Sequence, residues 1–317
     1  MSLFPPVFAH LRWFVNAGRF ADAEFLLDVS TALVVVGALA YVALAWYVHR
    51  SARFHGAAAR LEGVAEAGKG LDWRLVGALT GVMLLGNAFL GIYLAPNIEL
   101  GIAALVPVGA AAQVLVGLLL ILQITYSVSG ALVLVVAVLT LGVVSPWLML
   151  DYVFEFVALG IALVLVGPSL SRLDRGAYKW LGLDPGRWTR LAVPVIRIGV
   201  GLTLVALALH NKLLNPGLTL AFLEEYQFNF MPMIGFAGFT DLHFAFAAGI
   251  GELTLGLLIL FGVATRFVVA TLTVFFVLTL ILLGPMELLG HAPLVGIAIL
   301  LILRGSGRRA AESASPA

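Results

Sequence analysis

The chain has 317 residues, of which 62% are hydrophobic and only 11% are charged. This balance excludes a soluble globular domain, in which about a quarter of the residues are charged. The net charge of +1 gives no reason to expect a nucleic-acid partner, and the absence of cysteine excludes disulfides, cysteine-ligated clusters and thiol relays. The expected environment is therefore the lipid bilayer.

Apolar runs long enough to cross a bilayer, which takes about 20 residues, recur along the chain. We predict an all-α polytopic membrane bundle of about nine transmembrane helices. In chain order the predicted spans cover residues 28–48, 75–94, 101–122, 131–150, 152–168, 193–211, 243–264, 267–284 and 293–304.

The two ends of the chain differ from the spans in composition. Segment 4–25 mixes Arg12 and Arg19 with aromatic residues, which predicts an interfacial helix on the outer surface. It lacks the basic region, long apolar core and cleavage site of a secretory signal. The tail over 305–317 is rich in Ala, Ser and Gly, which predicts disorder.

Lys and Arg concentrate on one side of the predicted spans. With the N-terminus outside, 15 of the 18 Lys and Arg residues fall on the inner side, mostly within 50–74 and 172–190. Only Arg12, Arg19 and Lys212 lie outside. Because this distribution obeys the positive-inside rule, we expect a multi-pass protein of the cell membrane with a cytoplasmic C-terminus.

The basic linker 169–192 divides the chain into two four-helix units. The first unit is expected over 75–168 and the second over 193–304. Residues 1–74 add the interfacial segment, an extra helix and a basic inner loop.

The two units match each other without a gap when the second is shifted back by 139 positions. Glu252 then falls on Gln113, Gly256 on Gly117 and Pro285 on Pro146. Chance matching of Leu- and Val-rich sequence is the alternative to an internal repeat.

Glu252 is a carboxylate in the middle of an apolar run. Placing a charged carboxylate there costs several kcal/mol of free energy unless it is protonated, paired with a cation or hydrated. Ala245, Gly249 and Gly256 lie on its helical face, so the side chain is expected to point towards protein. Burial would favour the neutral carboxyl, which can carry a proton. The alternative is a structural hydrogen bond between helices.

The loop between the first two helices of the second unit runs from residue 211 to 242 and is not an ordinary polar connector. Its mixture of apolar residues with Gly and Pro predicts a short surface helix over 218–230 and a segment dipping over the bundle. Two interpretations remain open: a fixed cap or a lid over a cavity.

Three segments of the second unit carry a recognisable pattern. They are Arg197-Ile198-Gly199-Val200-Gly201, His210-Asn211-Lys212-Leu213, and Glu252-Leu253-Thr254-Leu255-Gly256-Leu257-Leu258 with Gly262 and Thr265-Arg266. With them the second unit resembles the DoxX family of small four-helix membrane proteins, and the first unit is a degenerate copy. Leu209 replaces a common Gly, and Arg304-Gly305-Ser306-Gly307 replaces the usual ending. The resemblance implies a link to thiosulfate:quinone oxidoreduction or to membrane oxidant-defence complexes.

Further residues complete the candidate sites. Arg197, about one turn into the membrane, either reaches back to the interface or pairs with Glu252, and the two form the candidate catalytic set. Lys212, with His210 and Glu224, could bind an anion such as a sulfur oxyanion. His210, His243 and His291 all fall at outer helix ends, which predicts a copper or zinc site if they converge.

These features lead to a principal function and two alternatives. The principal one is a membrane subunit of a quinone-linked oxidoreductase or redox-defence system, with quinone as the expected cofactor and other membrane subunits as partners. The second is a small-solute carrier with Glu252 as coupling acid. The third is a structural membrane partner without catalysis.

Overall fold

The structure is a computed structural model that describes residues 20, 22–25, 27–95, 97–283 and 285–307. Within these residues every regular element is helical and there is no β-strand, so the all-α class is confirmed. The interfacial helix predicted over 4–25 and the tail predicted over 305–317 fall largely outside the described residues.

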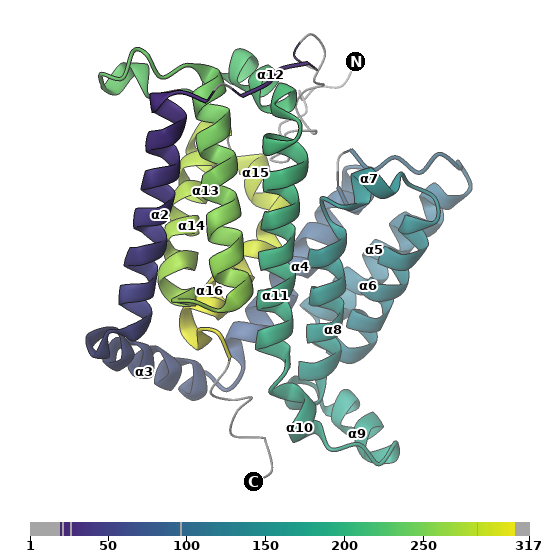
Figure 1. The fold of residues 1–317 in the computed structure, drawn as a ribbon. Helices are drawn as coiled ribbons and strands as arrows, with labels where there is room; N and C mark the ends of the chain where they lie inside the picture. Colours follow the sequence, from purple (N-terminus) through teal and green to yellow (C-terminus); the bar gives the residue numbers. More distant parts are fainter. Residues whose placement is uncertain (1–19, 21, 26, 96, 284, 308–317) are drawn as a thin grey trace.

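Long helices run roughly along one common direction, and short helices lie at the two ends of the bundle (Figure 1). In chain order the helices are α2 (Val29–Arg50), α3 (Ala52–Ala67), α4 (Leu71–Phe89), α5 (Leu105–Ile121), α6 (Tyr126–Leu141), α7 (Pro146–Met149), α8 (Val153–Leu170), α9 (Arg172–Trp180), α10 (Pro185–Thr189), α11 (Ala192–Leu207), the π-helix η2 (Ala208–Leu213), α12 (Pro216–Tyr226), the 3₁₀-helix η3 (Pro232–Ile234), α13 (Asp241–Phe261), α14 (Thr265–Leu283), α15 (Pro285–Gly290) and α16 (Ala292–Arg304). We call the two ends the α12 end and the α3 end.

Four of these helical segments are long and apolar enough to cross a membrane: Val29–Arg50, Val153–Leu170, Ala192–Leu213 and Asp241–Phe261. Four further apolar helices are shorter: Leu105–Ile121, Tyr126–Leu141, Thr265–Ile281 and Ala292–Arg304. Apolar helices of these lengths support a lipid bilayer as the environment. The predicted count of nine spans is not confirmed.

Two predicted connectors contain helices. The predicted basic inner loop between the first two spans includes the 16-residue helix α3, because the Arg residues there alternate with Ala, Leu and Glu, which favour helix. Arg266 Nη2 lies 2.8 Å from Glu62 Oε1 and pins α3 to the start of α14.

The predicted linker 169–192 likewise folds into α9 and α10. Asp174 of α9 is buried and accepts hydrogen bonds from the backbone N–H groups of Tyr126, at 2.7 Å, and Ser127, at 3.2 Å. It thereby closes the N-terminus of α6, where free N–H groups favour a carboxylate. This explains why α6 begins five residues before the predicted span 131–150.

The internal repeat has a structural counterpart. The helices α6 and α14, α7 and α15, and α8 and α16 begin 139 residues apart, at Tyr126 and Thr265, Pro146 and Pro285, and Val153 and Ala292. The turns that precede α6 and α14 also correspond, since Gln123 and Gly262 both have a positive φ, of 55° and 70°. Agreement of helix starts and of a rare backbone conformation favours duplication over chance matching. We call α4–α8 the first unit and α11–α16 the second unit.

The two units meet through equivalent surfaces. The first helix of each unit packs against the last long helix of the other, α11 against α8 and α4 against α16. Glycines allow both approaches, because a Cβ atom at Gly199 would overlap Ala158, and one at Gly296 would lie 3.0 Å from Val76 Cα. This arrangement is an approximate two-fold relation between the units.

The extra helix α2 packs on the second unit, on α13 and α14, although it precedes the first unit in the chain. The Tyr41 hydroxyl donates to Thr271 Oγ1 at 2.8 Å, and the Tyr41 ring stacks on Phe267 with centroids 5.6 Å apart. The position of this helix in the chain therefore does not indicate the unit on which it packs.

Candidate functional site

The predicted residues Glu252 and Lys212 form an ion pair near the α12 end of the second unit. Lys212 Nζ donates to Glu252 Oε2 at 2.6 Å, and the two side chains are 18% and 20% exposed. Glu252 lies on α13 and Lys212 in η2, the π-helical turn that extends α11. Single π-turns within α-helices occur frequently at functional sites.

Small residues on α13 make this contact possible. Gly249 lies one turn before Glu252, and a Cβ there would come within 2.6 Å of Leu213 Cδ2 and 3.2 Å of Lys212 Cβ. Gly256, one turn after Glu252, would place a Cβ 2.9 Å from Leu204 Cβ on α11. Ala245, Gly249 and Gly256 are all buried. The predicted stripe of small residues is thus the contact surface for α11 and η2, and Glu252 points towards them.

The segment after η2 covers this end of the second unit (Figure 1). The surface helix predicted over 218–230 is present as α12, which packs on α13 and η2. Phe222 is buried and stacks on Tyr226, with ring centroids 4.9 Å apart, and Phe228 lies 6.0 Å from Phe244 of α13. Aromatic packing of this kind holds α12 and the residues after it against α13, while the two interpretations of the segment, a fixed cap or a lid over a cavity, stay predictions.

Glu224 lies on the exposed side of α12, and its backbone carbonyl accepts a hydrogen bond from Gln227 Nε2 at 2.8 Å. The predicted anion-binding set is therefore divided between α12, which carries Glu224, and η2, which carries His210 and Lys212.

His210 joins the two units. Its Nδ1 lies 3.1 Å from Oδ1 of Asp151, which is fully buried just before α8 in the first unit. The His210 ring also lies 5.7 Å from the ring of Trp147 in α7. Sequence analysis missed Asp151 as a partner because the two residues are 59 positions apart.

Arg197 connects the ends of two other helices at the α3 end. It is buried, and its guanidinium donates to main-chain carbonyl oxygens of Ile259, at 2.6 Å, Leu260, and Ser306, at 3.2 Å. These carbonyls belong to the last turn of α13 and to the residues after α16. The guanidinium thus donates to carbonyl groups of the kind left unpaired at a helix C-terminus, at the end of the bundle towards which the first predicted arrangement directs it. Pairing with Glu252 stays a prediction.

The three histidines proposed as a metal site have separate environments. His243 Nε2 lies 2.8 Å from Asp28 Oδ2 at the start of α2, and the His291 ring lies 5.2 Å from that of Phe276. In the part of the chain that the structure describes, no group of three or more His, Cys, Asp or Glu side chains could hold a metal ion. The predicted copper or zinc site is thus not formed by His210, His243 and His291.

The contact between Asp28 and His243 was not predicted. Asp28 is the N-cap of α2, and the backbone N–H of Thr31, followed by the imidazole of His243, lowers the pKa of its carboxyl. Thr240 caps α13 in the same way and bonds to His243. This pair attaches α2 to α13 at the α12 end.

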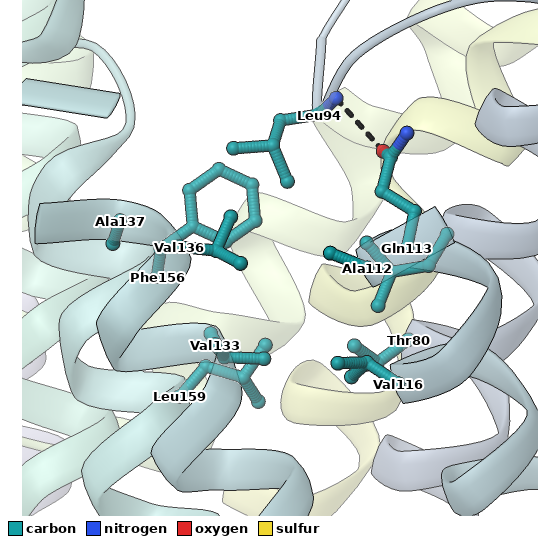
Figure 2. Close-up of a pocket in the computed structure, with 11 residues that line it drawn as sticks. Thr80, Leu94, Ala112, Gln113, Val116, Val133, Val136, Ala137, Phe156 and Leu159 are labelled. Carbon is teal, nitrogen blue, oxygen red and sulfur yellow. Dashed lines mark hydrogen bonds between the residues drawn. The ribbon is translucent and has the colours of Figure 1, made fainter. Parts of the chain in front are cut away.

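Gln113 occupies in the first unit the position of Glu252 in the second. Its Oε1 accepts from the backbone N–H of Leu94 at 2.9 Å (Figure 2). Its Nε2 donates to Ile92 O at 3.0 Å. The side chain lies at one end of a small apolar cavity between α4, α5, α6 and α8. Both residues therefore tie the second helix of a unit to the end of the first, but with different chemistry.

Comparison with protein-family models, with curated proteins and with solved structures finds no match to this chain. The DoxX resemblance remains a prediction based on the segments quoted above.

Proposed function

We propose that the chain is a multi-pass protein of the cell membrane with nine membrane crossings, its α12 end outside and its α3 end in the cytoplasm. The basic residues of α3, α9 and α10 all lie at the α3 end, as the positive-inside rule requires of a cytoplasmic surface. Helices shorter than about 20 residues can be accommodated by local thinning of the bilayer.

The ion pair Lys212–Glu252 is the proton-handling centre of this protein, which serves as a membrane subunit of a quinone-linked oxidoreductase or redox-defence system. The observation that carries this proposal is a 2.6 Å contact between an ammonium and a carboxylate, both about four-fifths buried, which joins the two elements on which α12 packs, η2 and α13. Protonation of Glu252 would free the ammonium of Lys212 for an incoming anion or carbonyl oxygen. A substrate reaching Lys212 and the uptake of a proton by Glu252 are therefore coupled.

This donor set suits a quinone or a sulfur oxyanion. An ammonium donates to a quinone carbonyl or to an oxyanion, and an adjacent carboxyl supplies a proton when electrons are taken up. His210 and Glu224 border the approach from outside, whereas Arg197 holds the end of α13 and acts on the site through the position of that helix.

Quinone reduction tests this proposal. The protein is purified with any bound subunits, examined by native mass spectrometry for retained quinone and partners, and placed in nanodiscs with thiosulfate and a short-chain ubiquinone. We expect Glu252→Gln and Lys212→Met to lower the rate at least tenfold, because each removes one half of the proton-handling pair. Glu225→Gln, on the exposed side of α12, is the matched control and should retain the rate. An unchanged rate in folded Glu252→Gln would refute the assignment.

The approximate two-fold relation between the units favours one second candidate, a small-solute carrier. Carriers built from repeats move one unit against the other around a site near their interface. Proton-driven uptake of thiosulfate into vesicles, lost in Glu252→Gln while quinone reduction is absent from the wild type, would select the carrier. If the protein assembles with its partners but shows neither quinone reduction nor thiosulfate uptake, the result would favour the third alternative, a structural membrane partner.

A further inference from the structure

The nine-residue helix α9, at the α3 end, combines features that none of the helices discussed above has together. It follows α8 and packs on α8 and α6, beside the ends of these two apolar helices (Figure 1). Because successive residues of an α-helix are about 100° apart around its axis, the side chains of α9 fall into three sectors. One sector attaches the helix to the first unit, one is basic and one is apolar.

The attached sector fixes the depth of α9 in the membrane. Buried Asp174 accepts from the backbone N–H groups of Tyr126 and Ser127 in the first turn of α6. One turn after Asp174, the Tyr178 hydroxyl donates to Val164 O of α8 at 3.0 Å. The helix α9 therefore lies level with the start of one apolar helix and beside the end of another. This is the depth at which the hydrocarbon core of a bilayer gives way to lipid headgroups.

The basic sector consists of Arg172, Arg175 and Lys179. These residues lie within about 60° of one another around the helix, and all three are exposed. Arg175 Nε donates to Pro168 O at 3.1 Å, which keeps this side chain near the end of α8. In the part of the chain that the structure describes, neither Arg172 nor Lys179 pairs with a carboxylate. Both cations are therefore available to an anionic ligand.

The apolar sector consists of Leu173, Ala177 and Trp180, again within about 60° of one another. Leu173 is 64% exposed and Trp180 is 86% exposed. The turn after the helix adds Leu181 and Leu183, which are exposed as well. A face with Trp and Leu beside a face with Lys and Arg is typical of helices that lie in the membrane interface. The apolar residues there enter the acyl-chain boundary, while the basic side chains reach the headgroups.

We propose that α9 is a binding site for anionic phospholipids in the leaflet at the α3 end. Trp180 and Leu173 insert at the boundary between headgroups and acyl chains, and Arg172 and Lys179 bind the headgroup phosphate. A zwitterionic headgroup compensates its own phosphate with a choline cation, so the basic sector favours lipids without one. The site requires a bilayer around the apolar helices, but neither quinone chemistry nor the ion pair of the second unit.

Quenching of Trp180 fluorescence in nanodiscs tests this site. The full-length protein is placed in phosphatidylcholine with a small, increasing fraction of phosphatidylglycerol or phosphatidylcholine brominated on its acyl chains. The Trp180 signal is the difference between the wild type and Trp180→Phe. Half-maximal quenching should need a mole fraction of brominated phosphatidylglycerol about fivefold lower than of brominated phosphatidylcholine. This is the affinity difference expected from one basic residue at an anionic surface.

Charge variants separate headgroup selection from insertion. Arg172→Gln combined with Lys179→Gln should abolish the preference for phosphatidylglycerol, while brominated phosphatidylcholine still quenches. Arg53→Gln combined with Arg60→Gln, on exposed residues of α3 at the same end, is the matched control and should keep the preference.

Three results in the wild type would overturn the proposal. Equal quenching by the two brominated lipids would mean that α9 does not select anionic headgroups. Quenching by aqueous acrylamide but by neither lipid would place the apolar sector in water. Protection from acrylamide and from both lipids would mean that a second copy of the chain or another protein covers this sector.

Discussion

Gln113 in the first unit and Glu252 in the second occupy equivalent positions but bind different partners. The amide of Gln113 donates to one main-chain group and accepts from another after α4, so the contact is complete and neutral. The carboxylate of Glu252 instead meets the ammonium of Lys212. The comparison shows that the repeat preserves a helix-to-helix contact, and that the contact consists of ionisable groups in the second unit only.

The largest expected effect comes from the glycines that both units share. A Cβ at Gly117 would lie 2.8 Å from Leu85 Cγ, and one at Gly256 would lie 2.9 Å from Leu204 Cβ. Gly117→Val and Gly256→Val should each destabilise the protein by about 2–3 kcal/mol, the range for overpacking. Thermal unfolding in detergent measures this. Gly37→Ala, where nothing lies within 4 Å, is the control, and a loss in only one unit would contradict equivalent packing.

Lys212→Met tests the charged contact of the second unit. It leaves Glu252 largely buried without its cation, and the cost should be about 2 kcal/mol. This is less than the 3–5 kcal/mol of a fully buried pair, because both side chains are about one-fifth exposed. Lys212→Met combined with Glu252→Leu should recover most of the loss in a thermal-unfolding double-mutant cycle. Additive losses would mean that the two side chains do not interact.

Gln113→Leu tests the neutral contact of the first unit, between Gln113 and the main chain after α4. It removes two hydrogen bonds and leaves the Leu94 N–H without that acceptor, which should cost about 1–2 kcal/mol. Gln113→Glu should retain the bond from Leu94 but face the carbonyl of Ile92 with a carboxylate, so its cost should fall as the pH is lowered. The same unfolding assay at two pH values measures both, and a pH-independent cost for Gln113→Glu would argue against this geometry.

The smallest effect concerns α2, which is attached to the second unit through Asp28 and His243. The pKa of Asp28 is lowered in the folded protein, so the folded state binds this proton less readily than the unfolded state. The resulting stabilisation is present above the ordinary Asp value of about 3.9 and is lost as the pH falls through the lowered folded value. Asp28→Asn should remove this part of the acid dependence of unfolding, whereas Asp22→Asn should retain it.

Periodicity and small residues were sufficient to predict the parts of the fold that depend on local sequence. Gly249 and Gly256 predicted the buried face of α13, and the shift of 139 residues anticipated that Pro146 and Pro285 occupy equivalent positions. The helix α3 was missed because its Arg residues were interpreted as marks of a loop, although its Ala and Glu content favours helix.

Long-range polar contacts were less accessible to sequence reasoning. His243 meets Asp28 across 215 residues, and no local pattern specifies such a partner. Arg197 bonds to main-chain carbonyls, which every residue offers, so residue identities alone do not indicate its partners. The pairing of Lys212 with Glu252, which lie 40 residues apart, needed the path of η2 as well as both residue types.

The packing of α2 on the second unit also affects the order in which the protein can assemble. This helix is synthesised before both units, yet the hydroxyl that Tyr41 contacts belongs to a residue 230 positions later. During insertion α2 must therefore remain against lipid until α13 and α14 enter the bilayer, while the first unit can associate earlier. A chain truncated before α13 would retain a complete first unit and an N-terminal helix without the helices on which it packs, so we expect closure of the second unit to be the last step of folding.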